Sequence, residues 1–287
     1  MSVWKSMLSL MQEVIRRPGG LFGFVIIAAI IVAAIGAPFI APFGPADQDT
    51  ENLLQPPSKE HPLGTDHLGR DLLSRLIFGS RIALATAFPA VLLSALMGLT
   101  LGLIAGFFGG AVDGIIVTFL DAIMTFPSVI FAMALMALLG PSLLNLIIVI
   151  AVTWMPFYAR LSRAEILSAK QNEYVEAEIA LGASTFRIIV RHILPNIISP
   201  IVVAMAMDLP IVITTEAGFS FLGLGVKPPQ PSWGVILSDG FDYIRHSPWP
   251  ILFASLILIV VTLGFTRFGE ALRDVMDPRF RELEVPR

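Results

Sequence analysis

The chain has 287 residues, of which 55% are hydrophobic and 14% are charged, and its mean hydropathy is +0.80. Soluble domains carry about 25% charged residues, so this composition excludes a water-soluble fold and indicates an integral membrane protein. The formal net charge of −3 and the lack of a Lys/Arg block give no sign of nucleic-acid binding, and the absence of cysteine excludes disulfides, thiolate metal sites and a cysteine nucleophile.

Six apolar segments are long enough to cross a bilayer, which takes about 20 mostly apolar residues in a helix. They are approximately residues 21–41, 84–107, 114–139, 143–158, 197–219 and 250–266. The first follows Arg16 and Arg17, as a signal peptide would, but its apolar run is longer than the hydrophobic region of a signal peptide, which favours a retained anchor. We therefore predict an all-α protein with six transmembrane helices.

Basic residues indicate the orientation of these spans. Six spans with both termini in the cytoplasm place 13 of the 19 Lys and Arg residues inside. The basic residues left outside are Lys59, Arg70, Arg75, Arg81, Lys227 and Arg245. Because cytoplasmic loops carry the excess of positive residues, both termini are expected in the cytoplasm.

Three parts follow from this topology. Residues 1–80 would form a cytoplasmic segment, the first span and an external loop; residues 81–270 a core of five spans with a cytoplasmic hairpin at about 160–196; and residues 271–287 a cytoplasmic tail. The amphipathic stretch 68–82 suggests a helix lying at the membrane interface. The proline-rich loop 223–247 suggests a non-helical external cap, with Trp233 as an interfacial aromatic.

Small residues recur every fourth position along the second predicted span. They are Ser94, Gly98, Gly102, Gly106 and Gly110. Such a stripe allows neighbouring helix backbones to approach closely, so we expect a helix-packing surface, with a pore-lining role as the alternative. Prolines at 89, 127, 156 and 210 predict local kinks, which are either gating hinges or static bends.

Acidic residues within spans are costly when they face lipid, so they are expected to face protein or water. Asp121 and Glu216 lie near span ends, whereas Asp208 lies deep. Met205, Asp208 and Glu216 are therefore the candidate residues of a translocation path. Proton coupling through Asp208 or Asp121 is an alternative function, that of a secondary transporter working without an ATPase.

The most distinctive polar segment runs from Glu173 to Asn196 and predicts a helix, a turn and a second helix. Gly182 suits a left-handed cap at the end of the first helix, and Ser184 suits the N-terminal cap of the second, which Pro195 should stop. A simple connector between two spans needs only a few residues, so a hairpin of this length suggests a rigid lever.

This segment resembles the EAA loop of ABC importer permeases, whose pattern is Glu-Ala-Ala, three residues, Gly, and an Ile-x-Leu-Pro ending. Glu176, Ala177 and Gly182 occupy the leading positions, with Ala183 beside the glycine, and Leu194 and Pro195 occupy the end. Two positions depart from the pattern. Glu178 replaces the third-position alanine, and His192 stands at the usual isoleucine position.

A second resemblance extends over nearly the whole chain. The segments 61–81 and 219–234 are similar to those of the dipeptide, oligopeptide and nickel permeases, and the extra first span is typical of the C-type member of that permease pair. The alternative for the first segment is a metal site at His61, Asp66, His67 and Asp71. Asp66 as a helix cap, or Asp71 paired with an arginine, explains these residues without a metal.

The resemblance implies a type I ABC importer permease fold in a bacterial inner membrane. The implied partners are a second permease, two ATP-binding subunits, an extracytoplasmic solute-binding protein and membrane lipid, with no cofactor, metal site or catalytic residue on this chain. No glycine is followed by lysine, so the phosphate-binding Gly-Lys-Ser/Thr loop is absent and any ATPase must be another polypeptide. A membrane-embedded hydrolase is disfavoured, because no His-Glu-x-x-His run or Ser/His pair lies at membrane depth.

Overall fold

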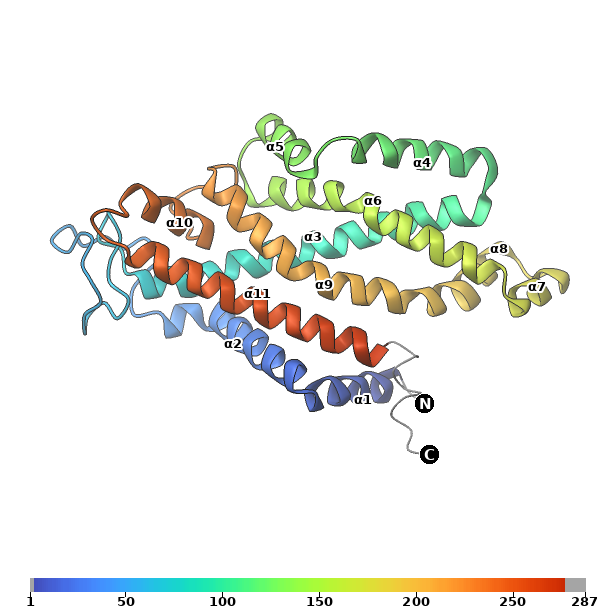
Figure 1. The fold of residues 1–287 in the computed structure, drawn as a ribbon, viewed down its shortest axis with the longest axis horizontal. Coiled ribbons are helices and arrows are strands. Elements are labelled where there is room, and N and C mark those ends of the chain that lie inside the picture. The colour runs from blue at the N-terminus through green and yellow to red at the C-terminus, as the bar shows by residue number, and fades with distance from the viewer. Residues whose placement is uncertain (1–2, 277–287) are drawn as a thin grey trace. The chain divides into compact units, whose positions relative to one another are not determined.

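The computed structural model describes residues 3–276, and side chains from residue 9 onward except those of Glu176 and Ile179. The described chain is helical, with one isolated bridge between Thr65 and Asp71 as its only β pairing (Figure 1). The helices are α1 Val3–Arg16, α2 Pro18–Ile40, α3 Leu72–Phe108, α4 Gly110–Met124, α5 Ser128–Leu139, α6 Leu143–Lys170, α7 Glu173–Ala180, α8 Thr185–Arg187, the π-helix η1 Ile188–Ile193, α9 Leu194–Phe221, α10 Trp233–Asp242 and α11 Trp249–Met276. Residues 271–276 of the predicted tail form the end of α11, and residues 277–287 lie outside the described residues.

Within residues 3–276, five helices are long and apolar enough to span a membrane, and α4 with α5 forms a sixth if that bent pair is one span. All six predicted spans are therefore found as helices, but the third is not a single helix. Its two halves meet at an angle of 87° around residues 125–127. Pro127 has no backbone N–H and disfavours helical geometry at Phe126, which accounts for the end of α4 and the new start at Ser128.

Two predictions about the predicted external loops are wrong. The stretch 68–82 is not a separate interfacial helix, because α3 begins at Leu72 and continues without interruption to Phe108. The loop 223–247 is not wholly irregular, because it contains α10. Helix formation resumes at Trp233 once the prolines have passed and the side chain of Ser232 caps the new helix by accepting a hydrogen bond from the Gly234 N–H at 3.1 Å.

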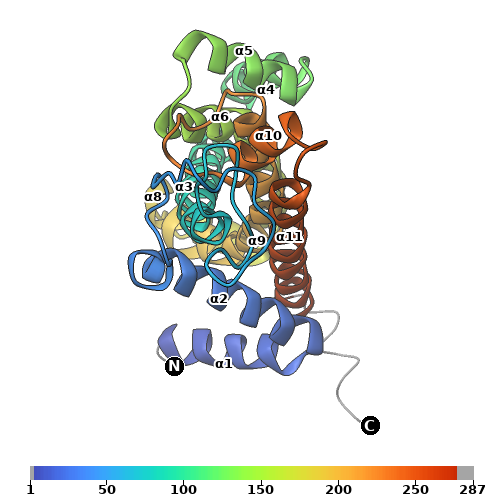
Figure 2. The same ribbon diagram turned by 90° about the vertical axis from the view of Figure 1, so that its left-hand side faces the viewer.

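The chain divides into two compact units, which we describe separately. The first comprises the chain up to Pro89, Met136–Ile147 and the chain from Ala206 onward. Within it α2 runs beside α11, as Figure 1 and Figure 2 both show. A Cβ at Gly23 would lie 2.5 Å from the carbonyl oxygen of Gly264, so only glycine permits this approach. At one end of the pair, Arg17 is 3.1 Å from Asp274.

The second unit comprises Ala90–Leu135 and Ile148–Met205. Here the small-residue stripe of α3 packs against α6, as a Cβ at Gly102 would lie 2.6 Å from the carbonyl oxygen of Ala159. The predicted helix-packing surface is thus confirmed at Gly98, Gly102 and Gly106, but not at Gly110, which begins α4 and has no atom within 4 Å of its Cβ position. Asp113 in the first turn of α4 binds Arg163 of α6 through two contacts of 2.5 Å, which neutralises both charges.

Candidate functional site

The hairpin predicted from the sequence is present, and it lies entirely within the second unit. Helix α7 ends in a turn in which Gly182 has a φ of +77°, and the Ala183 N–H donates to the Glu178 carbonyl at 3.0 Å. This bond and the left-handed glycine are the Schellman termination of a helix. Ser184 then caps α8 by accepting from the Arg187 N–H at 3.4 Å. The caps expected at Gly182 and Ser184 are confirmed.

The second arm differs from the prediction, because Pro195 does not stop it. Residues Thr185–Phe221 form one continuous helical segment that leads directly into the span α9. Proline lacks the N–H that an α-helix needs and clashes with the carbonyl four residues earlier. Before Pro195 the chain adopts the wider π-helix η1, where the Leu194 N–H bonds to the Ile189 carbonyl five residues back. The wider turn accommodates the proline, so the second arm of the hairpin continues into α9 without a break in helical structure.

Large apolar side chains are exposed at the tip of the hairpin. Leu181 is 83% exposed and Phe186 is 75% exposed, on either side of the turn at Gly182. Gly182 is itself exposed, and no atom lies within 4 Å of the position that its Cβ would take. Because this pair lies in a polar hairpin and not within the predicted span 197–219, its exposure indicates a candidate protein-binding surface.

The other residues predicted for this site are spread along the two arms of the hairpin, with Leu194 and Pro195 at the far end of the second arm, where α9 begins. Ala177 is exposed on α7, Ala183 and Leu194 are half-buried, and Pro195 is exposed. Glu176 belongs to α7, but its side chain lies outside the described residues. Leu181 and Phe186 were not predicted from the sequence. Their position, as large apolar residues close to a capping glycine in a polar hairpin, is a signal from which they could have been predicted.

The residues predicted for the translocation path all lie on α9 but differ in how far they are buried. Met205 and Asp208 are half-buried, whereas Glu216 is 0% exposed. One carboxylate oxygen of Glu216 accepts hydrogen bonds from the hydroxyls of Ser220 at 2.7 Å and Ser232 at 2.8 Å. In this conformation Glu216 therefore anchors the start of α10 to the end of α9.

A groove of about 540 Å³, lying within the first unit, is lined by α9 and α11. Its lining residues are Met207, Pro210, Ile211, Thr214, Thr215, Thr262 and Thr266. The threonine hydroxyls at 214, 215 and 262 donate to carbonyls of their own helices, so the groove presents methyl groups and hydroxyl lone pairs. The sequence analysis did not identify this groove, and the i, i+4 pair Thr262 and Thr266 was the signal that could have shown it.

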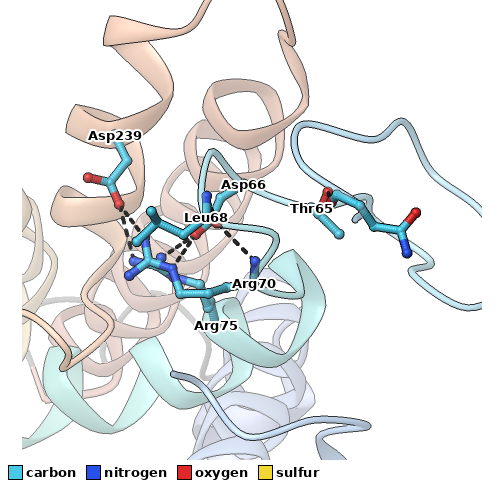
Figure 3. A network of polar contacts seen from close by, with 7 residues as sticks. Thr65, Asp66, Leu68, Arg70, Arg75 and Asp239 are labelled. Atoms are coloured by element: carbon cyan, nitrogen blue, oxygen red, sulfur yellow. Dashed lines mark hydrogen bonds and ion pairs between the residues drawn. The ribbon is translucent and has the colours of Figure 1, made fainter. Parts of the chain in front are cut away.

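Two acids and two arginines connect the segment before α3, α3 itself and α10 in a largely buried network (Figure 3). Arg70 lies 2.6 Å from Asp66 and 3.0 Å from Asp239, and Arg75 contacts both carboxylates as well. Arg75 is 1% exposed, so its charge is stable there only because it is paired. Nearby, the buried indole of Trp233 donates to the Leu76 carbonyl at 2.9 Å, so Trp233 is not an interfacial aromatic.

The roles expected for the two aspartates near this network are exchanged. Asp71, not Asp66, caps α3, since its carboxylate accepts from the Ser74 N–H at 2.7 Å and lies 3.0 Å from His61. Asp66 is the aspartate paired with arginines. Asp66, His67 and Asp239 could bring ligand atoms within 4.8 Å of one another, but arginine donors already occupy both carboxylates. The arrangement of these acids thus fits a structural clamp and not a metal site.

Comparison with solved structures identifies the class of the fold. The chain matches the methionine ABC transporter MetNI, in inward-facing conformations, with a TM-score of 0.58 at 19% identity over 71% of this chain and 97% of that one. An amino acid ABC transporter solved with histidines matches with a TM-score of 0.52 at 20% identity, over 69% and 92% of the two chains. The fold is therefore that of an ABC importer permease, as the resemblance implied.

The chain belongs to the family of binding-protein-dependent transport system inner membrane components, whose profile matches residues 98–282. Residues 4–57 also match the N-terminal transmembrane domain of oligopeptide transport permease C. The dipeptide transport permease DppC of Alkalihalophilus pseudofirmus is 40% identical, over 90% of this chain and 85% of its own. The oligopeptide transport permease OppC of Bacillus subtilis is 39% identical over 91% and 85%, and the glutathione transport permease GsiD of Pectobacterium atrosepticum is 38% identical over 94% and 89%.

Proposed function

We propose that this chain forms, together with a second permease, the translocation path for peptides or related small solutes delivered by a solute-binding protein. Three relatives between 38% and 40% identical are named as dipeptide, oligopeptide and glutathione permeases, which supports a peptide-like solute. Met205 and Asp208, half-buried on α9, are the proposed path residues. Glu216 would reach the path only if α10 separates from α9.

We assign ATP hydrolysis to two separate subunits of the transporter. The hairpin formed by α7, α8 and η1 is the proposed docking site for one of them. This assignment rests on Leu181 and Phe186, two exposed apolar residues beside the left-handed turn at Gly182. The helical segment that follows the turn continues into α9. Ala183 lies in the turn, Glu176 and Ala177 belong to α7, and Leu194 and Pro195 lie where the second arm passes into α9. An ATPase bound at the tip can shift the permease between two conformations only if its contacts with the hairpin are stronger in one conformation than in the other.

The hairpin and both termini are proposed to face the cytoplasm of a bacterial inner membrane. The contact between Arg17 at the start of α2 and Asp274 in the last turn of α11 supports placing both ends of the spanning region on one side. The excess of basic residues assigned to that side supports the cytoplasm. The clamp of Asp66, Arg70, Arg75 and Asp239 would then lie at the external surface.

Copurification and uptake test this function together. Extraction in mild detergent should bring down stoichiometric ATP-binding subunits and a second permease with this chain. Vesicles that hold the whole assembly should take up dipeptide only with ATP and binding protein. Full uptake by vesicles that contain this chain alone would overturn the proposal.

A further inference from the structure

The two positions of the hairpin that depart from the EAA pattern lie opposite each other. Glu178 projects from α7 and His192 from η1, and the His192 Nε2 is 3.4 Å from a carboxylate oxygen of Glu178. Both side chains are half-buried, with 24% of the His192 and 30% of the Glu178 side chain exposed. The sequence alone shows no relation between these two positions, but in the structure their side chains are in contact.

A second polar contact joins the same two arms. The amide of Asn196 donates to the hydroxyl of Tyr174 at 3.2 Å, four residues along each arm from the first pair. The same amide also donates to the His192 backbone carbonyl at 2.6 Å, which fixes it on its own arm. Tyr174, Glu178, His192 and Asn196 therefore form a polar ladder of two rungs between antiparallel arms. Val175 and Ile193 are fully buried alongside it.

We propose that Glu178 and His192 are a positioning pair that sets how much of an ATPase movement reaches α9. This inference rests on the proposed docking of an ATPase at the hairpin tip. A force applied at Leu181 and Phe186 reaches α9 along η1, whose wide π turns are less regular than an α-helix. The pair braces η1 against α7 near the end of that segment. Without the brace, α7 can shift against η1, and the hairpin absorbs part of the movement.

The test uses the assembled transporter in vesicles, with radiolabelled dipeptide as the probe. Glu178→Ala and His192→Ala each remove one partner, and the double substitution Glu178→His with His192→Glu reverses the pair. Glu173→Ala is the matched control, since it removes an exposed acid from the same helix outside the ladder. The readout is dipeptide transported per ATP hydrolysed, normalised to assembled complex, which a simple loss of folded protein does not change.

Each single variant should lower this ratio by roughly twofold to fivefold, the range expected when one half-buried polar contact worth about 0.5–1 kcal/mol is lost. The reversed pair should recover at least half of the wild-type ratio, and Glu173→Ala should match wild type. The positioning role would be overturned if both single variants had the wild-type ratio. It would also be overturned if the ratio of the reversed pair were no higher than that expected from the two single losses combined.

Gly182→Asp, measured in parallel, separates the two proposals, because normal transport by that variant would instead refute the docking of an ATPase at the hairpin.

Discussion

Substitutions at Gly182 should reduce transport according to how poorly the new residue adopts the left-handed backbone conformation, and not according to the size of its side chain. With a φ of +77° and no atom within 4 Å of its Cβ position, Gly182 has space for a side chain but a backbone that disfavours one. A residue other than glycine costs about 1–2 kcal/mol in the left-handed region, a factor of roughly 5 to 30 in the population of the native turn. Asparagine tolerates this region better than alanine, and valine tolerates it least.

Dipeptide uptake, normalised to the amount of complex in the membrane, should therefore fall in the order Gly, Asn, Ala, Val at position 182. Membrane insertion should stay at the wild-type level in all variants, because the turn lies outside the spans. Gly182→Asp should transport less than Gly182→Asn, which has the same shape, since only the aspartate places a charge beside the exposed Leu181. Equal uptake by the asparagine, alanine and valine variants would refute the role of the left-handed turn.

Three further substitutions test the packing of the spans and the clamp. Arg75→Ala leaves the buried Asp66 and the half-buried Asp239 with Arg70 as their shared arginine partner and should lower the stability of the detergent-purified protein by about 1.5–3 kcal/mol. Trp233→Ala should cost about 3–5 kcal/mol through the cavity it leaves, whereas Trp233→Phe, which loses mainly the hydrogen bond to Leu76, should cost about 1 kcal/mol. Gly102→Val should separate α3 from α6 and reduce the yield of folded protein.

Thermal unfolding in detergent and size-exclusion profiles measure these effects. Arg75→Lys is the control for the clamp and should rescue only in part, since lysine lacks the fork that reaches two carboxylates. Gly114→Val is the control for the packing surface, because nothing lies within 4 Å of that position. An Arg75→Ala variant as stable as wild type would contradict the clamp. Equal yields from the two glycine variants would contradict close packing at Gly102.

The spans and the hairpin could be predicted from the sequence because their signals are local. Apolar runs define the spans, and Gly182 and Ser184 carry their capping preferences within a few residues. The break between α4 and α5 had a local signal in Pro127, but the same residue type is accommodated within α3 at Pro89 and within α6 at Pro156. Surroundings, not residue type, decide whether such a proline bends or ends a helix.

Features that depend on distant partners could not be predicted. The roles of Asp66 and Asp71 were exchanged because Asp239, which completes the clamp, lies 169 residues from Arg70. Trp233 looked interfacial because its partner, the Leu76 carbonyl, is equally remote in sequence. Glu178 and His192 lie 14 residues apart on different arms of the hairpin, so their contact depends on how the two arms fold back on each other.

The central claim is that a separate ATPase grips the tip of the hairpin, and cross-linking tests it most directly. Because the chain has no cysteine, Leu181→Cys introduces a single reactive thiol at an 83% exposed position. In inside-out vesicles that hold the whole transporter, a short thiol-to-amine cross-linker at this cysteine should capture the ATP-binding subunit, with a yield that changes when ATP is added. A cysteine that reacts only with a reagent applied from the external face, or that never captures an ATPase, would contradict the account.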